Sequence, residues 1–337
     1  MRFDLCLPGR VLFGTGAIAG LGPEATRLGA STAVIVTSRG MPGRPAFAAA
    51  MESLARDGLQ TGLFTGVEPD PCLDNIAACV EAITERGGDL VVGIGGGSVM
   101  DVAKEAAADT GLPRIMVPTT AGSGSEVTHE AVFKVDGRKR AFVDAGLTPD
   151  VAIVDPDLSS TMPARLAASS GIDALAHAVE CYQSKRSNPL VRALAYGAYE
   201  LLRDNLVAAV EDRPGARASM ALGSLMAGMA FGNSGTTLGH ALSYPISNRG
   251  VPHGQAVALC LPGVLEFNRM EQSFAAALKD VVRLTGGHWQ PDWDISEMTE
   301  EVMADQRHLA NNPREVTAGD VRQLFQQIAA DFPPGPE

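Results

Sequence analysis

The sequence lacks several features that would place it in common protein classes. Only 5% of its 337 residues are aromatic, and 27 basic against 39 acidic side chains give a net charge of −12. Without a basic excess, the composition argues against a general nucleic-acid-binding or membrane-surface protein. No stretch reaches 18 apolar residues and no apolar leader follows Met1, so we expect neither a membrane span nor a signal peptide.

Cysteine is also scarce and dispersed. The five cysteines form no CxxC pair; they are Cys6, Cys72, Cys79, Cys181 and Cys260. An odd, scattered set is typical of free thiols in a reducing compartment. We therefore expect a cytoplasmic protein without a disulfide framework.

Hydrophobic residues are plentiful, at 45% of the chain, and their pattern changes along its length. In the first half, short apolar runs alternate with helical stretches. Strands are predicted at 31–37, 59–65, 89–94, 114–118 and 151–155, and helices at 44–57, 73–86 and 99–109. Such alternation predicts a mostly parallel sheet with helices on both faces.

After Asp155-Pro156 the chain becomes rich in Ala, Leu and Met, with helical periodicity as far as Gln327. We predict an α/β domain over residues 1–158 and an all-helical domain over residues 159–337. A length of 337 residues agrees with two domains.

A glycine-rich turn lies between the strand at 89–94 and the following helix. Backbone N–H groups at a helix N-terminus bind anions, and glycine has no side chain to keep a phosphate away. The candidates to hold a dinucleotide pyrophosphate are Gly95, Gly96, Gly97 and Ser98. The alternative is a tight strand–helix turn without a ligand.

A second polar turn follows the strand at 114–118. It contains Thr119, Thr120 and Ser123 among glycines. Small and hydroxyl side chains at the carboxyl ends of parallel strands suit contact with a phosphorylated ligand. An ordinary Gly/Ser loop is the alternative.

Three of the six histidines form a pattern with an aspartate. Asp173 and His177 are four residues apart and share one helix face. His240 and His253 follow in apolar, Ala-rich surroundings. One aspartate and three histidines suit a divalent ion such as Fe(II) or Zn(II), although satisfied core histidines are the alternative. The remaining histidines lack such a setting and are interpreted as structural: His129, His288 and His308.

Taken together, the motifs resemble those of the iron-containing (group III) alcohol dehydrogenases, and the resemblance runs nearly end to end. The segments that carry it are 95–104 (GGGSVMDVAK), 118–128 (PTTAGSGSEVT), 152–156 (AIVDP), 171–180 (GIDALAHAVE), 252–254 (PHG) and 311–321 (NNPREVTAGDV). The resemblance implies a dehydroquinate-synthase-like architecture, with a dinucleotide-binding α/β domain, a helical metal-binding domain and an active site in the cleft between them.

The resemblance also implies a function: a metal-dependent, NAD(P)H-linked alcohol dehydrogenase or aldehyde reductase. A hydride would pass between the nicotinamide and a small alcohol or aldehyde whose oxygen is bound to the metal. The implied metal ligands are Asp173, His177, His240 and His253, with Fe(II) favoured and Zn(II) the alternative. The implied coenzyme site adds Asp101, Thr119, Thr120 and Ser123 to the glycine turn. Members are usually cytoplasmic and often dimeric, so a homodimer is expected.

Two positions depart from the family pattern. Many members have an aspartate after the first strand, where it binds the adenosine ribose; here Ser38 stands at that position, followed by Arg39. A carboxylate would repel a 2′-phosphate and an arginine would attract it, so NADP(H) is favoured over NAD(H), unless Arg39 is merely solvated. Many members also have a histidine four residues after the third ligand; here Tyr244 is either a proton relay or a pocket wall.

The chain is also short for the family between residues 268 and 293, so we expect a trimmed helical domain. Arg249, which lies between two predicted ligands, is a candidate contact for an anionic substrate tail.

Other functions of the same fold stay open. They are a glycerol-dehydrogenase-like polyol enzyme, a maleylacetate-reductase-like enzyme that needs no metal, and a dehydroquinate-synthase-like lyase. The lyase would need Lys and Arg side chains around the metal, and the sequence shows no such cluster. The non-enzyme alternative is a dinucleotide-binding redox sensor, which has no need of the four-ligand set.

Overall fold

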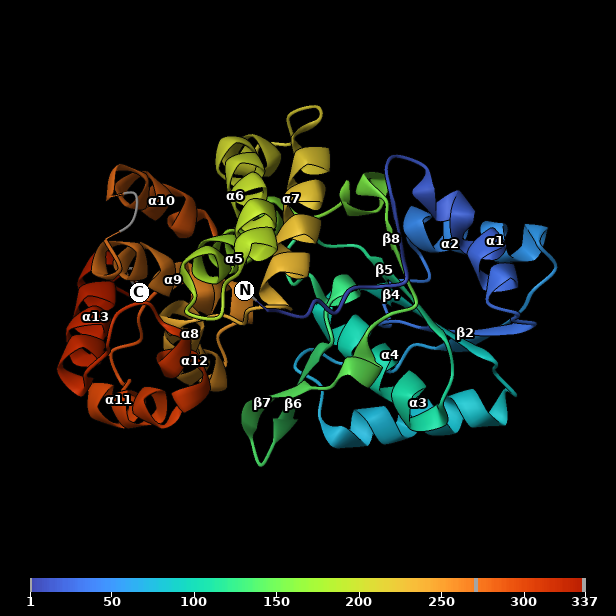
Figure 1. Cartoon of the computed structure of the whole chain (residues 1–337), viewed down its shortest axis with the longest axis horizontal. Helices are drawn as coiled ribbons and strands as arrows, with labels where there is room; N and C mark the ends of the chain where they lie inside the picture. The colour runs from blue at the N-terminus through green and yellow to red at the C-terminus, as the bar shows by residue number, and fades with distance from the viewer. Residues whose placement is uncertain (1, 270–271, 335–337) are drawn as a thin grey trace. The chain divides into compact units, whose positions relative to one another are not determined.

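The computed structural model describes residues 2–269 and 272–334, with the backbone alone for 272–277. The chain divides into two compact units, Met1–Met162 and Pro163–Glu337. The first unit is an α/β structure and the second is helical (Figure 1). The assignment of residues 1–158 to dinucleotide binding and of residues 159–337 to metal binding stays a prediction.

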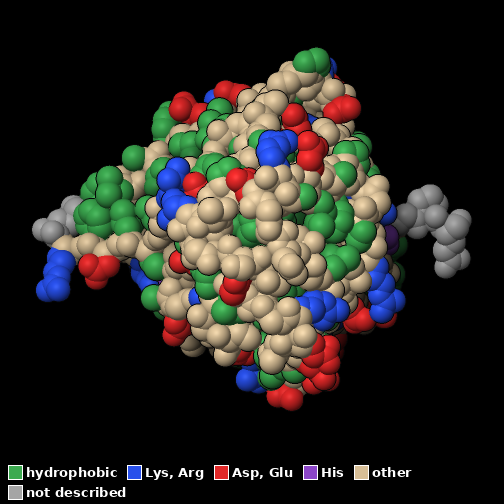
Figure 2. Space-filling view, turned by 90° about the vertical axis from the view of Figure 1, so that its right-hand side faces the viewer, with side chains coloured by type: hydrophobic (Ala, Val, Ile, Leu, Met, Phe, Trp, Pro, Cys, Tyr) green, Lys and Arg blue, Asp and Glu red, His purple; other side chains and the backbone are tan. Residues whose placement is uncertain are grey.

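The charged side chains on the surface form no basic patch on the face shown in Figure 2, as expected from the acidic composition. On the face shown in Figure 2, acidic and basic side chains are scattered among each other rather than gathered by charge. Within the described part of the chain, no helix is both long and apolar enough to cross a membrane.

A six-stranded parallel sheet forms the centre of the first unit, in the order β1-β8-β5-β4-β2-β3. Its strands are β1 (Arg10–Phe13), β2 (Thr32–Val36), β3 (Gln60–Phe64), β4 (Leu90–Gly95), β5 (Arg114–Pro118) and β8 (Val151–Val154). The parallel sheet predicted from the sequence is therefore confirmed. The edge strand β1 was not predicted, because it has only four residues and none of them is fully buried.

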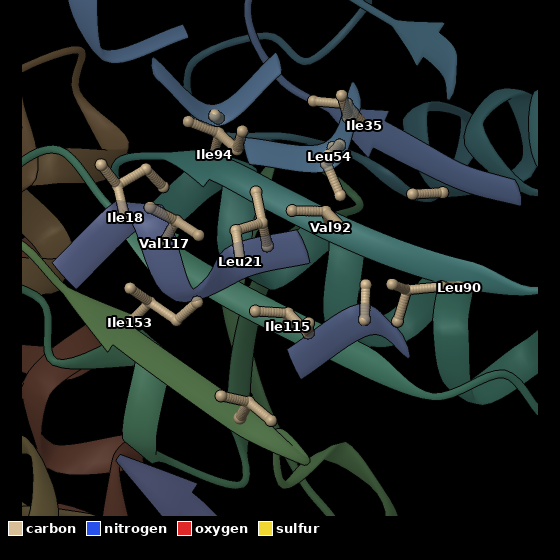
Figure 3. Close-up of a cluster of buried hydrophobic side chains, with 14 of the residues drawn as sticks. Ile18, Leu21, Ile35, Leu54, Leu90, Val92, Ile94, Ile115, Val117 and Ile153 are labelled. Atoms are coloured by element: carbon tan, nitrogen blue, oxygen red, sulfur yellow. The ribbon is translucent and has the colours of Figure 1, made fainter. Parts of the chain in front are cut away.

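Helices cover both faces of this sheet. One face packs against α1 (Leu21–Arg27) and α2 (Pro45–Arg56), and the other against α3 (Leu73–Glu85) and α4 (Gly97–Thr110). Neighbouring residues of β2 point to opposite faces, as the pleat requires: Val34 joins the α3/α4 cluster, and Ile35 joins the α1/α2 cluster shown in Figure 3.

The strand order creates a switch point. After β2 the chain moves to one side to form β3, then crosses to the other side of β2 to form β4. The connections that leave the carboxyl ends of β2 and β4 therefore run in opposite directions, which leaves a crevice between them. Open α/β sheets bind their ligands in a crevice of this kind. Ser38 and the Gly95–Ser98 turn lie at these two strand ends.

A short antiparallel hairpin completes the first unit. It consists of β6 (Glu130–Val135) and β7 (Arg138–Val143), and the turn residues Asp136 and Gly137 both have positive φ. The sequence analysis missed this hairpin, because its strands are charged and half-exposed.

The second unit is built from helices, and its described residues contain no strand. The helices are α5 (Ala164–Gln183), α6 (Pro189–Val210), α7 (Ala216–Phe231), α8 (Leu238–Asn248), α9 (His253–Phe267), α10 (Gln272–Leu284), α11 (Ile295–Ala304), α12 (Gln306–Asn311) and α13 (Ala318–Asp331). The predicted helical C-terminal region is therefore confirmed.

Candidate functional site

Four predicted metal ligands converge from three helices of the second unit. Asp173 and His177 lie one turn apart on α5, His240 lies in the first turn of α8, and His253 is the first residue of α9. A Cβ atom on Gly254 would lie only 2.8 Å from the carbonyl oxygen of Ser169. Glycine at this position therefore lets α9 begin directly against α5.

The ligand atoms of these residues face one another. The Nε2 atom of His240 lies 3.0 Å from Nε2 of His177 and 3.8 Å from Oδ1 of Asp173. The Nε2 atom of His253 lies 3.7 Å from the same carboxylate oxygen. Asp173, His177 and His240 are buried, and His253 is half-buried.

This arrangement fits a divalent cation. Oδ1 of Asp173 is buried and has no hydrogen-bond partner among the described residues, a costly state that a cation would relieve. The ligand atoms of Asp173, His240 and His253 all lie within 4.8 Å of one another, and His177 adjoins this group through its 3.0 Å approach to His240. Three imidazole nitrogens and one carboxylate oxygen form a set that suits Fe(II) or Zn(II).

A buried carboxylate orients one of these ligands. Glu180, on α5, lies 2.6 Å from Nδ1 of His240 and accepts hydrogen bonds from the backbone N–H groups of Thr237 and Gly239. Burial alone would raise the pKa of Glu180, but His240, the backbone N–H of Thr237 and His308 together outweigh it, and the pKa lies below its usual value. The carboxylate thus fixes Nδ1 as the donor, so that Nε2, which faces His177 and Asp173, is the candidate ligand atom.

The glycine before His240 makes this contact possible. A Cβ atom on Gly239 would lie 2.5 Å from Oε1 of Glu180. The sequence analysis quoted Glu180 within a motif but gave it no role. Its position seven residues after Asp173, on the same helix face, is the signal that would have identified it.

Aromatic stacking restrains a second ligand. The ring of His177 stacks on the rings of Phe231 and His240, with centroid distances of 4.1 and 4.7 Å and interplanar angles of 15° and 23°. Phe231 ends α7 and is buried. The sequence alone could not identify Phe231, because the contact joins two helices that are distant in sequence.

Tyr244 lies next to the ligands, one turn after His240 on α8. Its ring is half-buried and stacks on the ring of His253, with centroids 6.0 Å apart. This position is compatible with both predicted roles, and the choice between a proton relay and a pocket wall stays a prediction.

Arg249 has a different role from the one expected. Its guanidinium lies 2.8 Å from Glu301 and 3.1 Å from Glu297 of α11, and it also donates to the carbonyl oxygen of Pro245. Two carboxylates neutralise the charge that was expected to meet an anionic substrate. The structure therefore assigns Arg249 to holding α8 against α11.

In the first unit, the two polar turns lie side by side. The backbone N–H of Thr119 donates to the carbonyl oxygen of Gly95 at 2.9 Å. A Cβ atom on Gly97 would lie 3.0 Å from the side chain of Ser123, and one on Gly96 would lie 3.4 Å from Oγ1 of Thr120. The start of α4, which no side chain caps, is thus lined by hydroxyl groups and suits an anion.

Asp101 lies beneath this turn and is buried. Its Oδ1 accepts a hydrogen bond from Ser125 Oγ at 2.5 Å, and its Oδ2 accepts one from the backbone N–H of Val132 at 3.0 Å. Both oxygens are therefore used to tie α4 to the 3-10 turn η2 (Ser125–Val127) and to β6. Direct contact of Asp101 with a coenzyme stays a prediction, and a positioning role is the better supported one.

Ser38 is half-buried at the carboxyl end of β2, where it forms an isolated bridge with Gly66. Arg39 and Arg44 are both exposed in the segment that follows, and residues 37–44 contain no acidic side chain. Residues 37–44 therefore place no carboxylate at this end of the sheet that would repel a phosphate.

The role of Glu180 leads to a test on metal affinity. In Glu180→Gln, the amide nitrogen would face either Nδ1–H of His240 or the backbone donors, so one hydrogen bond is replaced by repulsion. We expect metal affinity to fall about 10- to 100-fold, as is typical for loss of an outer partner of a ligand. Chelator competition measures the affinity, circular dichroism verifies folding, and Glu200→Gln, an exposed change on α6, is the control. Equal affinities in the two variants would contradict the assigned role.

Comparisons with known proteins identify the family of the chain. Residues 8–156 match the family model "Iron-containing alcohol dehydrogenase", and residues 167–292 match "Fe-containing alcohol dehydrogenase family, C-terminal". Long-chain-alcohol dehydrogenase 1 of Geobacillus thermodenitrificans (strain NG80-2) is 32% identical, in an alignment that covers 94% of each chain.

Solved structures give the same result. A 1,3-propanediol oxidoreductase superposes with a TM-score of 0.91 at 30% identity, covering 97% of this chain and 100% of that one. Sulfoacetaldehyde reductase from Bifidobacterium kashiwanohense, solved in complex with NAD+, superposes with a TM-score of 0.89 at 30% identity, covering 98% and 99%. The chain therefore belongs to the iron-containing alcohol dehydrogenase family.

Proposed function

We propose that this chain is a metal-dependent, NAD(P)H-linked alcohol dehydrogenase or aldehyde reductase that acts on a small alcohol or aldehyde. The observation that carries the proposal is the convergence of Asp173, His177, His240 and His253. The similar proteins named above include an alcohol dehydrogenase, a propanediol oxidoreductase and a sulfoacetaldehyde reductase, which supports a carbonyl or carbinol substrate.

The four side chains would hold one divalent ion. When bound, such an ion supplies a Lewis acid that polarises the oxygen of an alcohol or aldehyde. Glu180 keeps Nε2 of His240 as the ligand atom, and Phe231 restrains the plane of His177. These contacts organise the ligands before any metal binds, so little reorganisation is needed during the reaction.

The first unit would bind the dinucleotide coenzyme at its switch point. Backbone N–H groups at Gly96, Gly97 and Ser98 would receive the pyrophosphate, with the hydroxyls of Thr120 and Ser123 beside them. Anion binding by backbone amides requires no basic surface, which explains how a chain with a net charge of −12 accommodates an anionic coenzyme.

The preferred coenzyme in this proposal is NADP(H). Ser38 leaves the end of β2 without a carboxylate, and the exposed guanidiniums of Arg39 and Arg44 lie in the segment that follows. A 2′-phosphate would gain a charge-assisted hydrogen bond from either arginine. Two properties remain predictions: a homodimer, which rests on the family resemblance, and a cytoplasmic location, which rests on the resemblance and on the dispersed cysteines.

The metal requirement is tested by turnover. The purified protein, loaded with Fe(II) or Zn(II), should oxidise NADPH or NADH in the presence of small aldehydes, lose this activity on chelation, and regain it when metal is restored. His253→Ala removes the most exposed of the four predicted ligands, so we expect this variant to fold. Its activity should fall by more than the ~10- to 100-fold that is typical when only an outer partner of a ligand is lost. His288→Ala, an exposed histidine outside the site, is the control. Turnover that survives complete removal of metal would refute the proposal.

The coenzyme preference is tested by Arg39→Ala. Loss of a hydrogen bond to a charged group should lower kcat/KM for NADPH roughly 10-fold and leave kcat/KM for NADH unchanged. Arg56→Ala, on the exposed side of α2, is the matched control, since Arg56 pairs with Glu52. A wild-type preference for NADH, or an equal decrease with both coenzymes, would exclude the 2′-phosphate site.

A further inference from the structure

One histidine that the sequence analysis set aside lies beside the candidate metal centre. His308, on α12, is 5% exposed. Its ring lies edge-on to Tyr244, with centroids 5.5 Å apart and an interplanar angle of 76°. It is also nearly parallel to the ring of His240, at a centroid distance of 6.5 Å. His308 therefore contacts both a predicted ligand and the tyrosine next to the ligands.

A carboxylate holds His308 in place. Oδ2 of Asp305 lies 2.6 Å from Nδ1 of His308, and Oδ1 of the same residue accepts the backbone N–H of His308. Burial alone would raise the pKa of Asp305, but the hydrogen bonds and charge of His308, with a smaller contribution from Arg307, together outweigh it, and the pKa lies below its usual value. Asp305 thus caps α12 and fixes the orientation and tautomer of the imidazole.

The opposite end of α12 is tied to the segment that leads into α8. The side-chain amide of Asn311 donates to the carbonyl oxygens of Ser234 and Thr236, at 2.9 and 3.0 Å. Its oxygen accepts hydrogen bonds from Ser184 and from the backbone of Arg186. Because α12 is fixed at both ends, His308 keeps one position relative to the helix that carries His240 and Tyr244.

We propose that the Asp305–His308 pair is a positioning element of the metal centre. The ring of His308 lies edge-on to Tyr244, whose ring stacks on His253, and it lies nearly parallel to the ring of His240. Without the imidazole, a space opens beside Tyr244 and its phenol gains other rotamers. The kinetic part of this inference rests on the proposed function.

The experiment separates positioning from helix capping. Asp305→Asn has a single acceptor oxygen, which can keep the short bond to Nδ1 of His308 at the expense of the longer bond from the backbone N–H. Asp305→Ser keeps the cap but has a side chain too short to reach the ring. These variants, His308→Ala and the control His288→Ala are prepared as full chains loaded with Co(II). The visible Co(II) spectrum reports ligand geometry, and steady-state kinetics separate kcat from KM.

We expect His308→Ala and Asp305→Ser to lower kcat about 10- to 100-fold with little change in coenzyme KM, and to shift the Co(II) spectrum. Asp305→Asn should retain most of the wild-type kcat, and His288→Ala should match the wild type. The proposal is overturned if His308→Ala equals His288→Ala in both kcat and spectrum. If His308→Ala does not fold, the proposal is overturned when Asp305→Asn and Asp305→Ser have the same kcat and the same Co(II) spectrum.

The two proposals fail in distinguishable ways. If the wild-type protein turns over no aldehyde with either coenzyme, the proposed function is wrong. The Co(II) spectra of the same variants still test positioning, because they require metal binding but no turnover.

Discussion

The hydrogen bond between Glu180 and His240 is the interaction on which the candidate metal centre depends. Glu180 lies on the helix that carries Asp173 and His177, and its carboxylate collects the imidazole of His240 and two backbone N–H groups at the start of α8. A fully buried carboxylate is costly unless it is paired, and these three donors offset that cost. One charge therefore joins α5 to α8 and sets which nitrogen of His240 faces the other ligands.

Further contacts extend this restraint outward from the ligands. Phe231 stacks on His177, and His308, held by Asp305, lies against both His240 and Tyr244. In the first unit, the strand order places an uncapped helix start and a hydroxyl-bearing turn together at the end of the sheet. In the proposed function, backbone N–H groups there bind the anionic coenzyme, so an acidic chain needs no basic surface for it.

Much of this could be predicted from the sequence, and the misses have physical reasons. Buried strands were recognised because β-branched runs are bounded by polar turns, and Asp173 and His177 because their spacing places them on one helix face. The hairpin β6–β7 was missed because charged, half-exposed strands carry no hydrophobic alternation. Arg249 was misassigned because its partner Glu301 lies 52 residues away in the sequence. The Asp305–His308 pair has a local spacing of three residues, but no local pattern reveals that His308 lies beside His240 and Tyr244.

X-ray absorption spectroscopy of the Zn(II)-loaded full chain tests the central claim most directly, because it counts ligands without requiring a substrate or turnover. The account predicts one ion per chain with three imidazole nitrogens and a carboxylate oxygen at about 2.0–2.2 Å. Fewer than three imidazoles around the ion, or a sulfur ligand from one of the five cysteines, would contradict it.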